Sequence, residues 1–117
     1  MQQLSLFNTS DIGWNDITED WLLNYLQSMY SDLKFAPTSG FNDDEVWIRQ
    51  TASKNARLVL YIKRDNDLKI WQNPTLVHLS VERRHHGYTG ESVAVNNFDD
   101  FYKTLANYVK KFEEWKN

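Results

Sequence analysis

Three histidines are the side chains best suited to metal binding in this chain, and their spacing argues against a metal site. They are His78, His85 and His86. Neighbouring histidines such as His85 and His86 do not easily point at one ion, and neither is part of a histidine pair spaced four residues apart, as in helical zinc sites. The chain has no cysteine, which excludes thiolate nucleophiles, disulfides and cysteine ligands. We therefore expect no metal.

An acidic residue two positions before a lysine is a second arrangement that could do chemistry, because nucleases use such pairs to hold a metal ion and orient water. The chain has three such pairs, which are Asp32/Lys34, Asp67/Lys69 and Glu114/Lys116. With 16 acidic residues in the chain, chance supplies about one pair. No serine, histidine and aspartate form a recognisable local motif for nucleophilic catalysis. We expect no catalytic residues, no cofactor and no enzymatic activity.

Basic side chains gather around two connectors. They are Lys63, Arg64, Arg83, Arg84, His85 and His86. If the strands predicted below form a meander, residues 64–67 and 84–90 lie at the same end of the sheet. The basic side chains would then form a rim that could bind a phosphate group or an acidic protein surface. The alternative is a solvated rim without a partner.

A mixture of aromatic and cationic side chains is expected on one face of the sheet. Alternation along the strands assigns to this face Trp47, Arg49, Val59, Tyr61, Lys63, Lys69, Trp71, His78 and Ser80. The opposite, apolar face carries Ile48, Leu58, Leu60, Ile62, Leu68, Ile70, Val77, Leu79, Val81, Val93 and Val95. Rings such as Trp47, Tyr61 and Trp71 could stack the bases of a single strand while the cations follow its backbone. The alternative is a half-exposed face, or one covered by Ile12 and Trp14.

The elements that position these residues follow from hydrophobic periodicity. Apolar residues at helical spacing predict a helix over 18–31 with Thr18 as N-cap, and a second helix after Asn97. Between them, residues 36–45 have the composition of a loop. Alternation of period two predicts strands at 45–50, 57–63, 68–72, 75–83 and 91–95. The expected fold is α+β: an antiparallel four- to five-stranded meander sheet with both helices packed on one face, in the order α-β-β-β-β-β-α.

The length, charge and composition of the chain limit the classes of protein to which it can belong. The length of 117 residues suggests one domain, over 17–117, preceded by a peptide and connector over 1–16. The net charge of −3 argues against a general nucleic-acid coating protein, which needs an excess of Lys and Arg. No apolar run reaches membrane-spanning length, and the N-terminus lacks the pattern of a signal peptide. A cytoplasmic protein with no membrane partner is expected.

The first seven residues, Met-Gln-Gln-Leu-Ser-Leu-Phe, are unusually apolar for a chain terminus. Their segment Gln3-Leu4-Ser5-Leu6-Phe7 resembles the pentapeptide by which bacterial proteins bind the DNA polymerase sliding clamp, whose consensus is Gln-Leu-Ser/Asp-Leu-Phe. The resemblance covers five residues and implies a partner, not a family. It implies that Gln3 enters a small polar pocket, that Leu6 and Phe7 fill a hydrophobic cleft on each clamp subunit, and that Leu4 supports them.

Two other interpretations of the chain stay open. Residues 1–8 could instead form an edge strand of the sheet, with no partner. A small aromatic-rich domain also resembles phage-encoded inhibitors in general, including anti-CRISPR proteins, and would then act on a protein through the rim of Arg64, Arg83, Arg84, His85 and His86. The expected function is accordingly that of an adaptor or inhibitor docked on the sliding clamp, or else a single-strand binder or a phage-type inhibitor.

Overall fold

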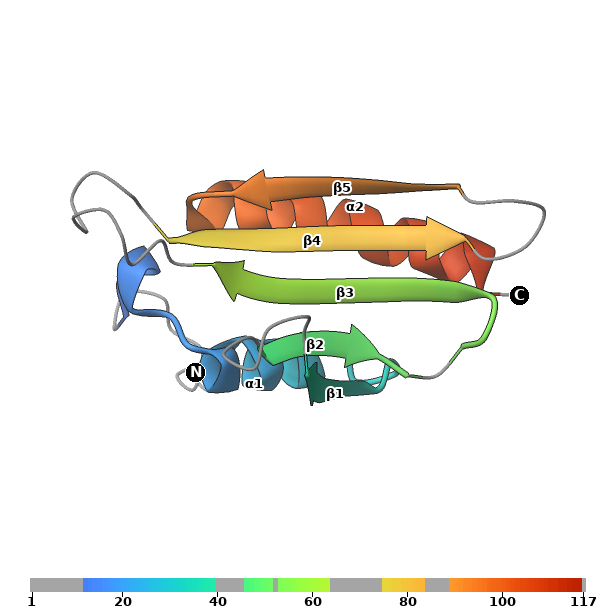
Figure 1. Ribbon diagram of the computed structural model, residues 1–117, viewed down its shortest axis with the longest axis horizontal. Helices are drawn as coiled ribbons and strands as arrows, with labels where there is room; N and C mark the ends of the chain where they lie inside the picture. The colour runs from blue at the N-terminus through green and yellow to red at the C-terminus, as the bar shows by residue number, and fades with distance from the viewer. Residues whose placement is uncertain (1–11, 40–45, 52, 64–74, 84–88, 117) are drawn as a thin grey trace.

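The computed structural model describes residues 12–39, 46–51, 53–63, 75–83 and 89–116 of the chain. Within these ranges, two helices lie behind a five-stranded antiparallel sheet, whose other face is turned toward the viewer in Figure 1. The elements follow one another as helix, five strands and helix. The predicted α+β fold and its element order are confirmed.

The helices begin where the sequence provides caps. Helix α1 spans Glu19–Met29, and the Thr18 hydroxyl oxygen accepts a hydrogen bond from the Trp21 backbone N–H at 3.1 Å. Helix α2 spans Phe98–Trp115, and the Asn97 side-chain oxygen accepts from the Asp100 N–H at 2.8 Å. Each cap satisfies a backbone donor that the helix itself leaves unpaired. A short 3-10 turn, η3, precedes α1 at Trp14–Asp16.

The sheet is a meander in which each strand pairs with its neighbours in the chain. Its strands are β1 Phe35–Ser39, β2 Val46–Gln50, β3 Ala56–Lys63, β4 Leu76–Arg83 and β5 Thr89–Val95, in the order β1-β2-β3-β4-β5. The prediction of a loop from residue 36 is wrong, because β1 occupies 35–39 and pairs with β2. The predicted strand at 68–72 lies outside the described residues.

The core lies between the sheet and the two helices. Its fully buried side chains include Ile17, Leu22, Leu26, Leu58, Leu60, Val77, Leu79, Val81, Phe101, Leu105 and Phe112. Sheet residues predicted for the apolar face are buried, with one described exception: Val93 is 39% exposed. Val93 lies on the edge strand β5, whereas α2 packs chiefly on β4 and β3. The helix therefore leaves Val93 partly exposed.

The segment before α1 is fastened to this core. The Trp14 indole N–H donates to the Thr75 carbonyl oxygen at 2.6 Å, and the Asn15 side-chain oxygen accepts from the Thr75 N–H at 3.0 Å. The Trp14 ring packs edge-on against Phe98, with ring centroids 5.1 Å apart. Residues 12–16, predicted as a connector, therefore pack on the domain. In the described part of the chain, no helix is long and apolar enough to cross a membrane.

Candidate functional site: the open face of the sheet

The face of the sheet turned away from the helices carries a row of three aromatic rings. The register aligns Trp47 of β2 with Tyr61 of β3, and Tyr61 with His78 of β4. Trp14 and Ile12, which were a predicted cover for this face, pack instead on the helix side, against the core. The three rings are half-buried, so the row forms part of the molecular surface.

The rings of this row stack on one another. Ring centroids are 5.2 Å apart for Trp47 and Tyr61 and 4.6 Å apart for Tyr61 and His78, with interplanar angles of 16° and 11°. At such distances, nearly parallel rings overlap face to face. Tyr61 therefore offers mainly its ring edge to a ligand, since both of its faces are in contact with neighbours. Only the outer faces of the row, on Trp47 and on His78, can accept another ring.

Both ends of the row are flanked by small side chains. Thr38 of β1 lies opposite Trp47, and Ala94 of β5 lies opposite His78. A planar group placed beside either end would meet a methyl or hydroxyl group instead of a bulky side chain. The row can therefore be extended at each end by one flat ligand group.

A shallow groove of about 290 Å³ runs beside the row. Its floor is Val59 and Ser80, which face each other across β3 and β4. Its far wall is an ion pair in which the Arg57 guanidinium donates two hydrogen bonds, of 2.9 and 2.5 Å, to one Glu82 carboxylate oxygen. Because Arg57 and Glu82 satisfy each other, the wall is polar with little net charge.

The predicted face residues that the structure describes lie where the alternation placed them. Arg49 of β2 and Lys63 of β3 are exposed beside the row of Trp47, Tyr61 and His78. Together with the Arg57–Glu82 pair, they give the described part of the face a net positive charge. Lys69 and Trp71, the remaining predicted members, lie outside the described residues. Arg57 and Glu82 were missed, although their direct opposition in the sheet follows once the register is known.

The predicted basic rim requires a correction. Because β4 follows β3 directly in the sheet, Lys63 lies opposite Leu76 while Arg83 lies opposite Ala56. Lys63 and Arg83 are therefore at opposite ends of the strand pair, and the prediction that they share a rim is wrong. Arg83 is exposed at the end of β4. The other predicted rim members are Arg64, Arg84, His85 and His86, and they lie outside the described residues.

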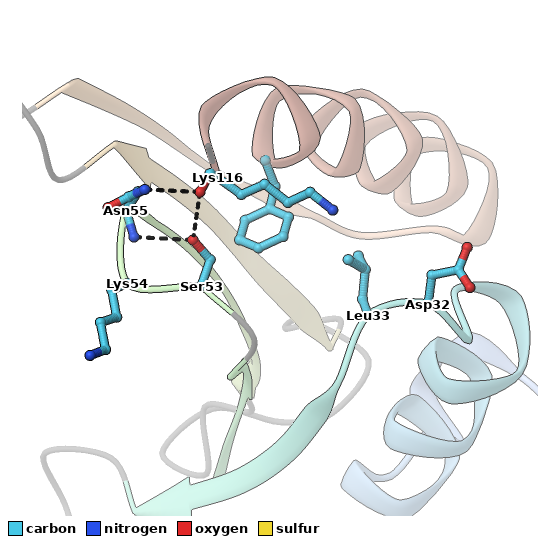
Figure 2. Close-up of a pocket in the computed structure, with 7 residues that line it drawn as sticks. Asp32, Leu33, Ser53, Lys54, Asn55 and Lys116 are labelled. Carbon is cyan, nitrogen blue, oxygen red and sulfur yellow. Dashed lines mark hydrogen bonds between the residues drawn. The ribbon is translucent and has the colours of Figure 1, made fainter.

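A second hollow, of about 560 Å³, opens between the C-terminal ends of the helices (Figure 2). Its lining includes the buried side chains of Leu33 and Phe112. The Ser53 hydroxyl and the Asn55 side-chain amide donate to the Lys116 carbonyl oxygen, at 3.1 and 3.0 Å. These polar groups satisfy the end of α2, a structural role, and we assign the hollow no ligand.

Within the described ranges, no cluster of three histidine or acidic side chains is arranged to hold a metal ion. The clamp-binding residues predicted from the sequence, Gln3, Leu4, Leu6 and Phe7, lie outside those ranges. Comparison with protein-family models, with curated proteins and with solved structures finds no match.

Proposed function

We propose that this chain is a non-enzymatic cytoplasmic binding protein that docks on the bacterial DNA polymerase sliding clamp through residues 3–7. The observation that carries the proposal is the match of Gln3-Leu4-Ser5-Leu6-Phe7 to the clamp-binding pentapeptide at all five positions. A short segment with two apolar anchors and one hydrogen-bonding side chain can bind a pre-formed cleft. The folded domain is then the part delivered to the clamp, as adaptor or inhibitor.

The described structure limits how far a clamp bound at residues 3–7 could lie from the domain. The chain is fastened to the domain from Trp14, Asn15 and Ile17 onward, and Ile17 is fully buried. Five residue steps separate Phe7 from Ile12, which limits their separation to about 18 Å. A clamp bound at residues 3–7 would therefore hold the domain close to its own surface, near the η3 end of the sheet in Figure 1.

The test is fluorescence polarisation of a labelled peptide of residues 1–8 with purified clamp, competed by the intact protein. We expect dissociation constants in the micromolar range, because so short a segment buries little area. Leu6→Ala with Phe7→Ala should abolish competition and Gln3→Ala should weaken it. Gln2→Ala, which lies outside the pentapeptide, is the matched control and should leave competition unchanged. Failure of both peptide and protein to bind at tens of micromolar would make the motif a coincidence.

A second candidate function is single-strand nucleic-acid binding on the open sheet face. It is favoured by the half-buried row of Trp47, Tyr61 and His78 beside the exposed cations Arg49 and Lys63. The stacked geometry limits the row to one base at each end, where aromatic stacking contributes about 1–3 kcal/mol per base. Affinity would therefore be low and strongly dependent on salt.

This candidate is tested by titrating the protein with a short oligonucleotide at low salt and following tryptophan fluorescence. Quenching should be lost in Trp47→Phe with Arg49→Ala and kept in Trp115→Phe, a tryptophan at the end of α2. Equal quenching in both variants, or none in the wild type, would exclude the open face as a single-strand binding site.

A further inference from the structure

The two edges of the sheet differ in how well they are protected against pairing. Strand β1 is five residues long and contains Pro37, which has no N–H to donate and is a common protective device on edge strands. Strand β5 is seven residues long, contains neither proline nor lysine, and is exposed from Thr89 to Ala94. Its one charged residue, Glu91, is in an ion pair with Lys111 of α2, and the described part of the chain places no strand beyond β5 in the sheet. A sheet edge of this kind is a template for another strand.

The helical layer covers this edge only in part, because Lys111 of α2 forms an ion pair with Glu91 and Val95 is buried, whereas the rest of β5 is exposed. Helix α2 runs obliquely behind the sheet, from β5 toward β3 (Figure 1), and packs chiefly on β4 and β3. Val93 on the helix side of β5 is consequently 39% exposed. On the open side, β5 presents only Gly90, Ser92 and Ala94. Small side chains there leave room for a neighbouring strand.

We propose that β5 pairs with β5 of a second copy, antiparallel along Thr89–Val95 about a two-fold axis at Ser92. The side chains of two directly opposite residues in an antiparallel pair point to the same face of the sheet. A two-fold axis must therefore place one residue opposite its own copy, because an axis between two neighbouring residues would pair side chains that point to opposite faces. An axis at Ser92 pairs all seven strand residues with each other. An axis at Val93 would pair only Glu91–Val95, because Gly90 and Thr89 would then face Asn96 and Asn97, where the chain leaves the sheet to begin α2.

Side-chain chemistry across this axis is compatible with a second copy. Ser92 faces its own counterpart, Gly90 faces Ala94, and Glu91 faces Val93. The carboxylate of Glu91 is already in an ion pair with Lys111 of α2, and no two like charges stand directly opposite, which would be destabilising. The Glu91 methylene groups can cover the exposed Val93. Such an interface is isologous, as two-fold dimers require, and forms one sheet from the five strands of each copy.

A single strand pair buries less area than a permanent dimer needs, so the dimer is expected to be weak and concentration-dependent. Sedimentation equilibrium from about 10 µM to 1 mM should show a mass rising from 13.9 kDa toward twice that value, with a dissociation constant on the order of 10–100 µM.

The axis position makes a charge-swap test possible. Ser92→Lys places two like charges face to face, as does Ser92→Glu, so each variant alone should weaken dimerisation at least tenfold. An equal mixture of the two should restore it, because Lys then faces Glu. Thr38→Lys, on the same sheet face at the β1 edge, is the matched control and should leave association unchanged.

Restoration by mixing also shows that both variants remain folded. A wild-type protein that stays monomeric to 1 mM overturns the proposal. Dimerisation that is unchanged in Ser92→Lys also overturns the proposal. If removal of residues 1–7 then abolishes dimerisation, the interface lies in that segment and not on β5. A mixture no more associated than the separate variants would show that Ser92 does not face its own counterpart, and would overturn the proposed pairing.

Discussion

Replacing Trp14 with alanine should destabilise the domain by about 3 kcal/mol. The half-buried indole packs against Phe98 and Phe101, with ring centroids 5.1 and 6.0 Å away, and donates a hydrogen bond to the buried residue Thr75. Replacing a fully buried tryptophan with alanine destabilises a protein by about 3–5 kcal/mol. Loss of the half-buried Trp14 ring should therefore cost about 2 kcal/mol. The lost hydrogen bond adds about 1 kcal/mol. For a domain of this size, the melting temperature should fall by roughly 10 °C.

Urea unfolding followed by circular dichroism measures this change, and two variants separate its parts. Trp14→Phe keeps a ring but not the donor, and should cost about 1 kcal/mol. Trp47→Ala, on the open face, is the matched control for loss of a half-buried ring and should cost about 2 kcal/mol by the same reasoning. If Trp14→Ala costs no more than Trp47→Ala, the hydrogen bond from Trp14 to Thr75 adds nothing measurable and does not anchor the segment before α1 to the domain.

Three further perturbations test the fold and the open face. Glu82→Ala should lower the free energy of unfolding by about 1–2 kcal/mol, because it leaves the half-buried Arg57 guanidinium without its carboxylate. In a double-mutant cycle, Glu82→Ala and Arg57→Ala together should cost less than the sum of their separate effects. Asn97→Ala should cost about 1 kcal/mol in urea unfolding by removing the cap of α2, whereas Asn97→Asp should cost little. Burial raises the pKa of the Tyr25 hydroxyl above its ordinary value of 10.0. The unfolded chain therefore releases this proton near pH 10, whereas the folded protein keeps it. The free energy of unfolding is consequently retained below pH 10 and falls as the pH rises further. Tyr25→Phe should reduce that alkaline loss in melting curves at pH 9 to 12, and an unchanged loss would assign it to other groups.

Periodicity predicted the helices and most of the sheet because burial is one-sided in this fold. Thr18 and Asn97 are caps whose mechanism is local, so both helix starts could be read from the sequence. Strand β1 could not, since Pro37 and the polar residues around it have the composition of a loop. Only pairing with β2, at an edge where a missing N–H costs little, makes that segment a strand.

The sequence predicts which residues share the open face of the sheet, but not how those residues lie relative to one another. Alternation placed Trp47 and Tyr61 on the same side, whereas their stacking in one row with His78 depends on the register between strands. Register is determined by connector length and tertiary packing, which the alternation does not contain. The same missing information led to the wrong placement of Lys63 beside Arg83, because that prediction inserted a strand between β3 and β4.

The proposed function requires that residues 3–7 bind the sliding clamp without help from the folded domain. It is best measured by calorimetric titration of purified bacterial clamp with the intact protein. We predict micromolar binding, loss of the heat signal in Leu6→Ala with Phe7→Ala, and a melting temperature for that variant within about 2 °C of the wild type. Absence of binding by the wild type at tens of micromolar, or a fall of many degrees in the variant's melting temperature, would refute the proposed function.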